Sequence, residues 1–141
     1  MKSPAELVEV FRAQGLKMTP QRLAVFEALD ADADHPTAEA VYERVSGDLP
    51  TISLRTVYQT LNDLVGMGEL QQLDLGTGST RFDTTPGPHH HVMCETCGLV
   101  RDVVADFDGI EIPEALADEF SITTTEVVFR GQCSRCATKA A

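Results

Sequence analysis

The chain has no tryptophan, only two tyrosines and no long apolar run among its 141 residues. Because a helix that crosses a membrane needs about 20 consecutive apolar residues, the sequence predicts no membrane span. The start of the chain also lacks the apolar stretch of a secretory signal, which indicates a soluble, cytoplasmic protein. Hydrophobic residues at 43% and charged residues at 23% are typical of a globular chain, so the composition argues against disorder.

Positive charge is also scarce. The chain has 11 Lys and Arg but 22 Asp and Glu, which gives a formal net charge of −11. Residues 1–82 contribute −5 of this charge and residues 83–141 contribute −6. A protein that wraps nucleic acid needs a basic surface to neutralise phosphates, and this chain does not offer one overall. Any DNA contact must therefore come from a local basic patch, or from a state in which bound cations offset the acidic charge.

Hydrophobic periodicity in the first part of the chain predicts short helices followed by a hairpin. The helices are expected at residues 4–14, 21–29, 37–47 and 53–65, and two strands at 69–75 and 79–83. In the second helix, Leu23, Phe26 and Leu29 are expected to share the buried face. Short helices closed by a two-stranded hairpin are typical of a winged helix-turn-helix.

The fourth predicted helix has the clearest amphipathic pattern, with Ser53 as its expected N-cap. Its apolar stripe consists of Leu54, Val57, Tyr58, Leu61, Leu64 and Val65. Its polar face consists of Arg55, Thr56, Gln59, Thr60 and Asn62. Side chains of this kind read base edges in the major groove, although a solvated helix face would show the same pattern.

The hairpin that follows favours the DNA interpretation of this helix. The residues of this helix expected to contact DNA are Arg55, Thr56, Tyr58, Gln59 and Asn62. Tyr58 lies on the apolar stripe, so packing is the alternative for it, and in a DNA complex it could reach a phosphate or a base. Lys17 and Arg22, near the start of the second helix, are expected to contact phosphates. Arg55 is the strongest candidate, because Arg makes the commonest specific contact with guanine.

A stretch with two prolines and a glycine, residues 84–88, separates this part from the rest and predicts a hinge. Beyond it we expect strands at 92–94, 99–104 and 121–130 and a short helix at 113–120. The sequence thus predicts an α+β protein. Its domains are a winged-helix DNA-binding domain at residues 1–83, the hinge at 84–88, and a small α/β dimerisation and metal-binding domain at 89–141.

Four cysteines form two Cys-x-x-Cys pairs, which are Cys94 with Cys97 and Cys133 with Cys136. Tetrahedral zinc takes four such thiolates, so the pairs predict a structural Zn(II) site. The 35 residues between the pairs exceed the spacing of compact zinc motifs, so the metal would join the two ends of the second domain. A redox-active dithiol is the alternative, and disulfides are disfavoured in the cytoplasm.

The histidines are grouped as His35 alone and His89, His90 and His91 in a row. In an extended segment, residues 89 and 91 point to the same side, and Asp83 and Asp102 lie near in sequence. Imidazole and carboxylate ligands suit Fe(II), Mn(II) or Zn(II). A capping or surface role for His35 and a polar loop for the triplet are the alternatives. Ligands on both sides of the hinge favour a metal sensor over a metal-dependent hydrolase, so no enzyme is expected.

Five segments in this order resemble the ferric uptake regulator family over roughly residues 4–137. They are Thr19–Arg22, His35–Ala38, Ser53–Tyr58, His89–Gly98 and Gly131–Cys136. The resemblance implies a homodimeric, metal-activated repressor that binds a double-stranded, palindromic DNA operator. It implies structural zinc on the four cysteines. It also implies a regulatory Fe(II) or Mn(II) on His35, Asp83, His89, His91 and Asp102.

Asp83 and Asp102 resemble the peroxide-sensing (PerR) branch, since iron-sensing members usually carry Glu there. The branch implies that peroxide reacts at bound Fe(II), oxidises His35 or His89, and so releases DNA. An iron-responsive repressor of metal uptake genes and a thiol-based redox zinc protein are the alternatives. Relatives with a further metal site use a His before the last cysteine pair. Residues 121–126 have none, so we expect no such site, and His90 stays without an assigned role.

Overall fold

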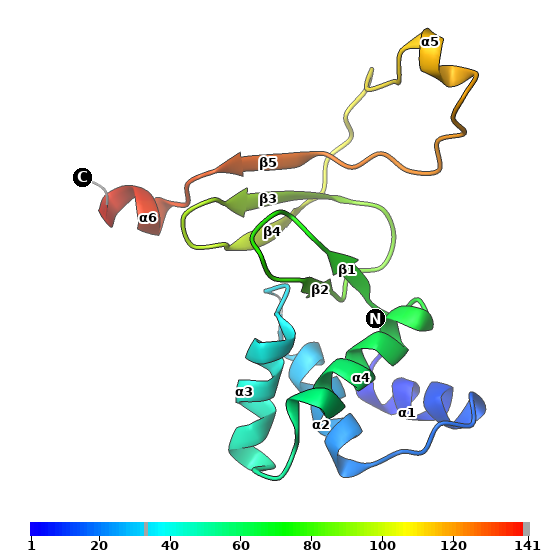
Figure 1. Cartoon of the computed structure of the whole chain (residues 1–141), viewed down its shortest axis with the longest axis vertical. Coiled ribbons are helices and arrows are strands. Elements are labelled where there is room, and N and C mark those ends of the chain that lie inside the picture. The colour runs from blue at the N-terminus through cyan, green and yellow to red at the C-terminus, as the bar shows by residue number, and fades with distance from the viewer. Residues whose placement is uncertain (33, 140–141) are drawn as a thin grey trace. The chain divides into compact units, whose positions relative to one another are not determined.

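The computed structural model describes residues 1–32 and 34–139, so the last two residues of the predicted domain 89–141 lie outside the described part. The chain divides into two compact units, Met1–Pro86 and Gly87–Ala141. Figure 1 shows helices in the first unit and a sheet in the second. Among the described residues, none of the helices is long and apolar enough to cross a membrane.

The first unit consists of helices and a hairpin, as the periodicity predicts. Its elements are α1 (Pro4–Ala13), α2 (Pro20–Asp30), α3 (Ala38–Asp48), α4 (Leu54–Gly66), β1 (Gln71–Leu73) and β2 (Arg81–Asp83). Each helix starts after a hydroxyl side chain that accepts a backbone N–H of the first turn. The capping residues are Ser3, Thr19, Thr37 and Ser53.

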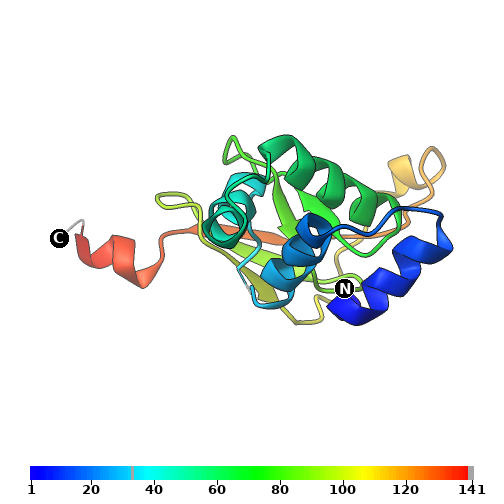
Figure 2. The same cartoon turned by 90° about the horizontal axis from the view of Figure 1, so that it is seen from below.

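The four helices pack around one apolar core, and Figure 2 shows α1, α2 and α4 crossing one another around it. Phe11 and Phe26 meet edge to face with ring centroids 4.9 Å apart. Val57, Leu61 and Leu64 of α4 are fully buried. The core anchors α4 by one side and leaves its other side exposed, which is the geometry a recognition helix needs.

Several positions on the predicted faces of α2 and α4 are wrong. Leu54 and Tyr58, expected on the apolar stripe of α4, are 36% and 38% exposed. Leu23, expected on the buried face of α2, is 37% exposed, whereas Val25, one turn before Leu29, is buried together with Phe26 and Leu29. Thr60, expected on the polar face of α4, is 1% exposed. Its hydroxyl donates to the Thr56 carbonyl at 2.8 Å, so burial leaves it without an unmet hydrogen bond.

The hairpin pairs antiparallel, with Gln71 opposite Asp83 and Leu73 opposite Arg81. Its strands are shorter than predicted: β1 ends at Leu73, and Asp74 Oδ1 then accepts the backbone N–H of Gly76 at 3.1 Å within the turn. Strand β2 also contacts the start of α3: Phe82 donates its backbone N–H to the Pro36 carbonyl at 3.0 Å. This contact brings the end of β2 to the residues just before α3.

The second unit is built on a sheet of strand order β4-β3-β5. Strand β3 (His90–Cys94) pairs antiparallel with β4 (Val100–Val103) and parallel with β5 (Val128–Gly131). Two short helices, α5 (Glu114–Ala117) and α6 (Ser134–Lys139), complete it. The α+β class and the winged helix are confirmed.

The strand predicted over 121–130 is wrong in its first half. Pairing with β3 begins at His91 opposite Val128, so the β-branched residues before it have no partner strand to pair with. The helix predicted over 113–120 is reduced to Glu114–Ala117, and α6 was not predicted.

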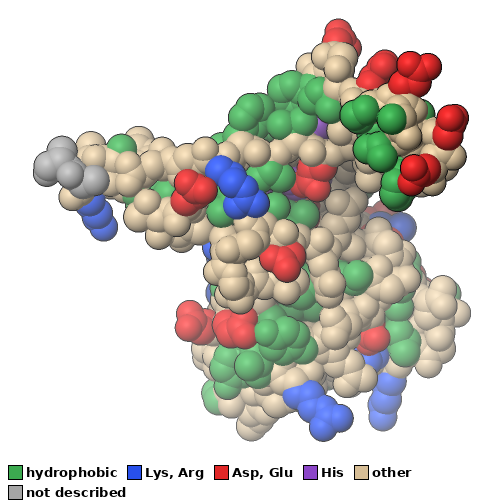
Figure 3. Space-filling view, turned by 45° about the horizontal axis from the view of Figure 1, so that its top comes forward, with side chains coloured by type: hydrophobic (Ala, Val, Ile, Leu, Met, Phe, Trp, Pro, Cys, Tyr) green, Lys and Arg blue, Asp and Glu red, His purple; other side chains and the backbone are tan. Residues whose placement is uncertain are grey.

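The segment between β4 and β5 exposes several large apolar side chains among acidic ones, as the mixed green and red surface around α5 in Figure 3 shows. Val104 is 90% exposed, Phe120 59% and Ile122 51%. Monomeric proteins seldom leave so many large apolar groups in water, so this surface is suited to a protein partner.

Candidate metal and nucleic-acid sites

The four cysteines lie together in the second unit, although 35 residues separate the two pairs. Their sulfur atoms are within 4.8 Å of one another, and Cys97 Sγ lies 3.8 Å from Cys133 Sγ. A zinc ion with Zn–S bonds of about 2.3 Å separates its tetrahedral ligands by about 3.8 Å. The thiols therefore fit a tetrahedral zinc ion.

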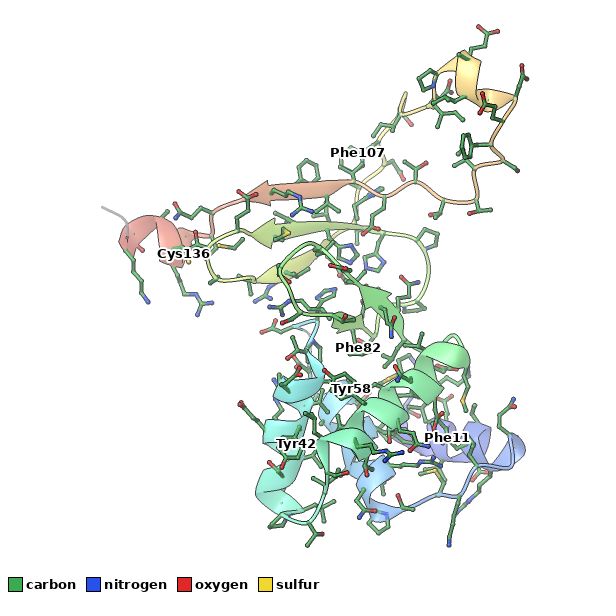
Figure 4. The ribbon with its side chains drawn as sticks, in the orientation of Figure 1. Phe11, Tyr42, Tyr58, Phe82, Phe107 and Cys136 are labelled. Carbon is green, nitrogen blue, oxygen red and sulfur yellow. The ribbon has the colours of Figure 1, made fainter. Side chains whose placement is uncertain are left out.

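Strand pairing explains why the pairs meet. The parallel register of β3 and β5 places Cys94 opposite Gly131, just before Cys133. Glu95 donates its backbone N–H to the Gly131 carbonyl at 2.8 Å, which holds the first Cys-x-x-Cys turn against the end of β5. Figure 4 shows Cys136 on α6, immediately beyond that strand.

Backbone donors prepare the thiols for a cation. Cys133 donates its N–H to Cys94 Sγ at 3.3 Å, and this bond with others lowers the pKa of Cys94 to about 6. The backbone N–H of Cys136 likewise lowers the pKa of Cys133. The pKa of Cys136 is raised to about 12, chiefly through its contact with Cys133. A divalent cation stabilises all four sulfur atoms as thiolates, including that of Cys136. The cluster therefore favours metal binding over four free thiols.

In the first unit, His35 Nε2 lies 3.5 Å from Asp83 Oδ2, and both side chains are buried. His35 has a φ of +35°, a left-handed conformation that is uncommon for a residue other than glycine. Arg81 holds this backbone by donating to the His35 carbonyl at 3.1 Å. Thr85 donates its N–H to Asp83 Oδ1 at 2.7 Å, which leaves Oδ2 toward the imidazole.

In the second unit, two imidazoles converge on one carboxylate. His89 Nε2 lies 3.2 Å and His91 Nε2 3.6 Å from the same oxygen, Asp102 Oδ1. The β3–β4 register places His91 directly opposite Asp102. Two ring nitrogens and a carboxylate oxygen at these separations fit one face of a divalent cation's ligand shell.

Sequence reasoning missed Glu126, which lies against the second group. Its Oε1 is 2.6 Å from His91 Nδ1, although 35 positions separate the two residues. A single glutamate after three threonines carried no motif, so only the pairing of β5 with β3 could reveal it.

Helix α4 exposes Arg55, Gln59 and Asn62, three of its five side chains predicted to contact DNA. Thr56 is half-buried, and its hydroxyl lies 2.9 Å from Ser53 Oγ. Tyr58, labelled in Figure 4, is 38% exposed and donates its hydroxyl to Glu39 Oε1 of α3 at 2.8 Å. This hydrogen bond raises the pKa of Tyr58, so the phenol stays protonated and able to donate.

The two predicted phosphate contacts differ in their surroundings. Lys17 is exposed and has the freedom to reach a phosphate. Arg22 is held inside the unit: its side chain is 15% exposed, and its guanidinium lies 3.3 Å from Asp63 Oδ2 and donates to the Lys17 carbonyl at 2.6 Å. Its main observed role is therefore to join α2 to α4.

A winged helix with an exposed polar helix, joined to a unit with a zinc-type cysteine site and His/Asp metal ligands, defines a metal-responsive DNA-binding regulator. The protein-family model described as "Ferric uptake regulator family" matches residues 13–130 of the sequence. The chain belongs to this family, whose regulators bind DNA as dimers, and the resemblance drawn from its motifs is confirmed. It is a metal-responsive repressor of the family.

Individual relatives show which members of the family this chain is similar to. The peroxide-responsive repressor PerR of Staphylococcus saprophyticus is 35% identical over 129 residues, which cover 91% of this chain and 87% of the relative. A zinc-bound manganese uptake regulator superposes with a TM-score of 0.71 at 27% identity, covering 94% of this chain and 99% of the other. PerR from Streptococcus pyogenes, described as a peroxide sensor, superposes with a TM-score of 0.56 at 27% identity, covering 96% and 94%.

Proposed function

We propose that this repressor senses hydrogen peroxide through a regulatory Fe(II) ion, and that Mn(II) can occupy the same site without reacting. The observation that carries the proposal is the convergence of His89 Nε2 and His91 Nε2 on Asp102 Oδ1, together with the buried His35–Asp83 pair. Aspartate at both carboxylate positions, and relatives named as peroxide-responsive repressors, support this branch of the family.

The proposed ligands come from both units. His35 and Asp83 belong to the first unit, and His89, His91 and Asp102 to the second. An ion bound by both groups would fix the relative orientation of the units across residues 84–88. Such an ion activates DNA binding only if it binds the DNA-competent arrangement more tightly than the others.

When bound, Fe(II) would activate hydrogen peroxide by passing it an electron that the oxidised ring later returns, so the two electrons that reduce peroxide come from the imidazole. The chain supplies the target: one oxygen atom of peroxide adds to the imidazole of His35 or His89, and the other leaves as water. The altered ring is a weaker ligand, so the two ligand groups separate and the repressor releases its operator. Because the ring is consumed, the protein acts as a sensor and not as an enzyme.

The proposed DNA-reading residues are Arg55, Thr56, Tyr58, Gln59 and Asn62 of α4, with Lys17 and Arg22 near phosphates. Two copies joined through the exposed apolar surface of the second unit would present two such helices to a palindromic operator. Such a protein would act in the cytoplasm.

Peptide mass spectrometry after peroxide treatment of anaerobic Fe(II) protein tests the proposal. We expect a gain of one oxygen on the peptide with His35 or His89, loss of operator binding, and neither change in Mn(II) protein. Oxidation confined to the cysteines would contradict it and favour a thiol-based sensor. Retained DNA binding after peroxide, with release only on Fe(II) removal, would favour an iron-responsive repressor.

A further inference from the structure

His91 is held from both sides of its ring. Its Nε2 faces Asp102 Oδ1 at 3.6 Å, and its Nδ1 lies 2.6 Å from Glu126 Oε1. The His91 side chain is 2% exposed, whereas that of Glu126 is 42% exposed. The glutamate therefore reaches from the surface of the sheet to a buried ring.

The backbone fixes Glu126 in this position. His91 donates its N–H to the Val127 carbonyl at 3.1 Å, and Val127 donates its N–H to His90 Nδ1 at 3.0 Å. Immediately after, Val128 pairs with His91 in the parallel β3–β5 ladder. These contacts fix Val127 and Val128, and so they keep Glu126 beside the imidazole of His91. They also give His90 a structural role.

We infer that Glu126 is a positioning residue for His91: it accepts the Nδ1–H proton and thereby keeps Nε2 as the ligand atom. The inference deepens the proposed function, because its consequence for metal affinity rests on the proposed regulatory ion. A carboxylate behind a metal-binding histidine fixes the tautomer and the ring orientation and increases the basicity of the ligating nitrogen. His89 has a weaker partner in this place, since its Nδ1 lies 3.0 Å from the Gly87 carbonyl.

The difference between the two histidines has a consequence for sensing. A carboxylate partner carries a full charge, whereas a backbone carbonyl carries only a dipole, so His91 is the more strongly held ligand. Glu126 thus preserves one strong imidazole ligand in the second unit while His35 or His89 serves as the oxidation target.

The experiment compares Glu126→Ala, Glu126→Gln and the control Glu119→Ala, which removes an exposed glutamate of the same unit. Nuclear magnetic resonance of zinc-loaded protein without Mn(II) or Fe(II) observes the Nδ1–H proton of His91, and electron paramagnetic resonance of free Mn(II) gives the affinity. We expect Glu126→Ala to lose the protected Nδ1–H signal and to weaken Mn(II) binding by about 10-fold or more. Glu126→Gln keeps an oxygen acceptor, so it should retain the signal and lose less affinity.

Zinc content equal to that of the wild type in every variant shows that the second unit has folded. The inference is overturned if Glu126→Ala keeps the protected Nδ1–H signal, or binds Mn(II) as tightly as Glu119→Ala. It is also overturned if Glu126→Gln keeps the signal but loses as much affinity as Glu126→Ala, because Glu126 would then be a direct ligand. Failure of the wild type to bind Mn(II) would contradict the proposed function. The Nδ1–H signal would still show whether Glu126 accepts the hydrogen bond from His91.

Discussion

Asp102 lies at the centre of the proposed ligands in the second unit, because one of its carboxylate oxygens faces the Nε2 atoms of both His89 and His91. The side chain enters the group only through the β3–β4 register, which places it opposite His91. At the residue scale, two of the proposed metal ligands are each held in place by one neighbour. Thr85 does this for Asp83 and Arg81 for the backbone of His35.

Replacing Asp102 by Asn keeps the shape of the side chain and removes its charge. We expect Mn(II) affinity to fall by about 100-fold, because Asn removes an anionic ligand oxygen and loss of even a residue that only orients a ligand costs about 10–100-fold. Asp106→Asn, an exposed position of the same unit, serves as the control. Titration with Mn(II) measures both, and equal affinities would contradict the assignment of Asp102.

Replacing His35 by Ala tests the ligand group of the first unit. The dimer and the zinc content should stay unchanged, because neither depends on this residue in the proposal. Metal-dependent DNA binding should be lost. Fluorescence anisotropy with operator DNA, with and without Mn(II), measures this loss, and a variant that still responds to Mn(II) would remove His35 from the site.

The lowered pKa of Cys94 predicts a pH dependence in the reduced, metal-free protein. A thiol with a folded-state pKa of about 6, below its ordinary value of 9.0, stabilises the fold fully above pH 9. This contribution is lost as the pH falls from about 9 to about 6. The difference in urea midpoint between the wild type and Cys94→Ser should therefore shrink over this range. A difference that grows on acidification would contradict the proposed pKa.

At the element scale, α4 shows which features of a helix a sequence pattern predicts and which it does not. Ser53 is the N-cap and Val57, Leu61 and Leu64 are buried, as the pattern predicts, because capping and periodicity are local properties. The burial of Thr60 could not be predicted, since it depends on which neighbours cover that side of the helix. The same limit applies to Arg22, whose ion pair with Asp63 joins two helices.

Arg55→Ala should weaken operator binding by about 10-fold or more, since a good bidentate contact with a base contributes about 1–3 kcal/mol. Zinc content should not change, because Arg55 lies in the other unit. A matched Arg12→Ala substitution changes an exposed arginine of α1. If both variants bind operator equally, α4 is not the recognition helix.

Glu39→Gln tests the contact between α3 and α4. The carboxylate accepts the Tyr58 hydroxyl and adds a negative charge beside the proposed DNA-facing surface. Removing that charge should strengthen operator binding a few-fold, and the gain should diminish at high salt. Glu43→Gln, one turn further along α3, is the control. Weaker binding by Glu39→Gln alone would show instead that the hydrogen bond holds Tyr58 in its reading position.

At the scale of the whole molecule, a chain of net charge −11 has to bind a polyanion. Binding is therefore confined to local surfaces, and in the proposed function a regulatory cation would both offset charge and link the proposed ligands of the two units. Selective removal of that metal, with zinc retained, should lower operator affinity by at least about 10-fold without dissociating the dimer. Anisotropy and sedimentation measure the two quantities, and equal affinity before and after removal would contradict metal activation.

The sequence by itself determined the Ser53 cap and the buried residues Val57, Leu61 and Leu64 of α4, the hairpin and the two Cys-x-x-Cys pairs, because each depends on residues a few positions apart. The tertiary structure alone decided which distant groups meet. The β3–β5 register joins the cysteine pairs and brings Glu126 to His91, and the contact of β2 with the start of α3 brings Asp83 to His35. Strand pairing over 35 residues leaves no local pattern, since its stability comes from contacts that exist only in the folded chain.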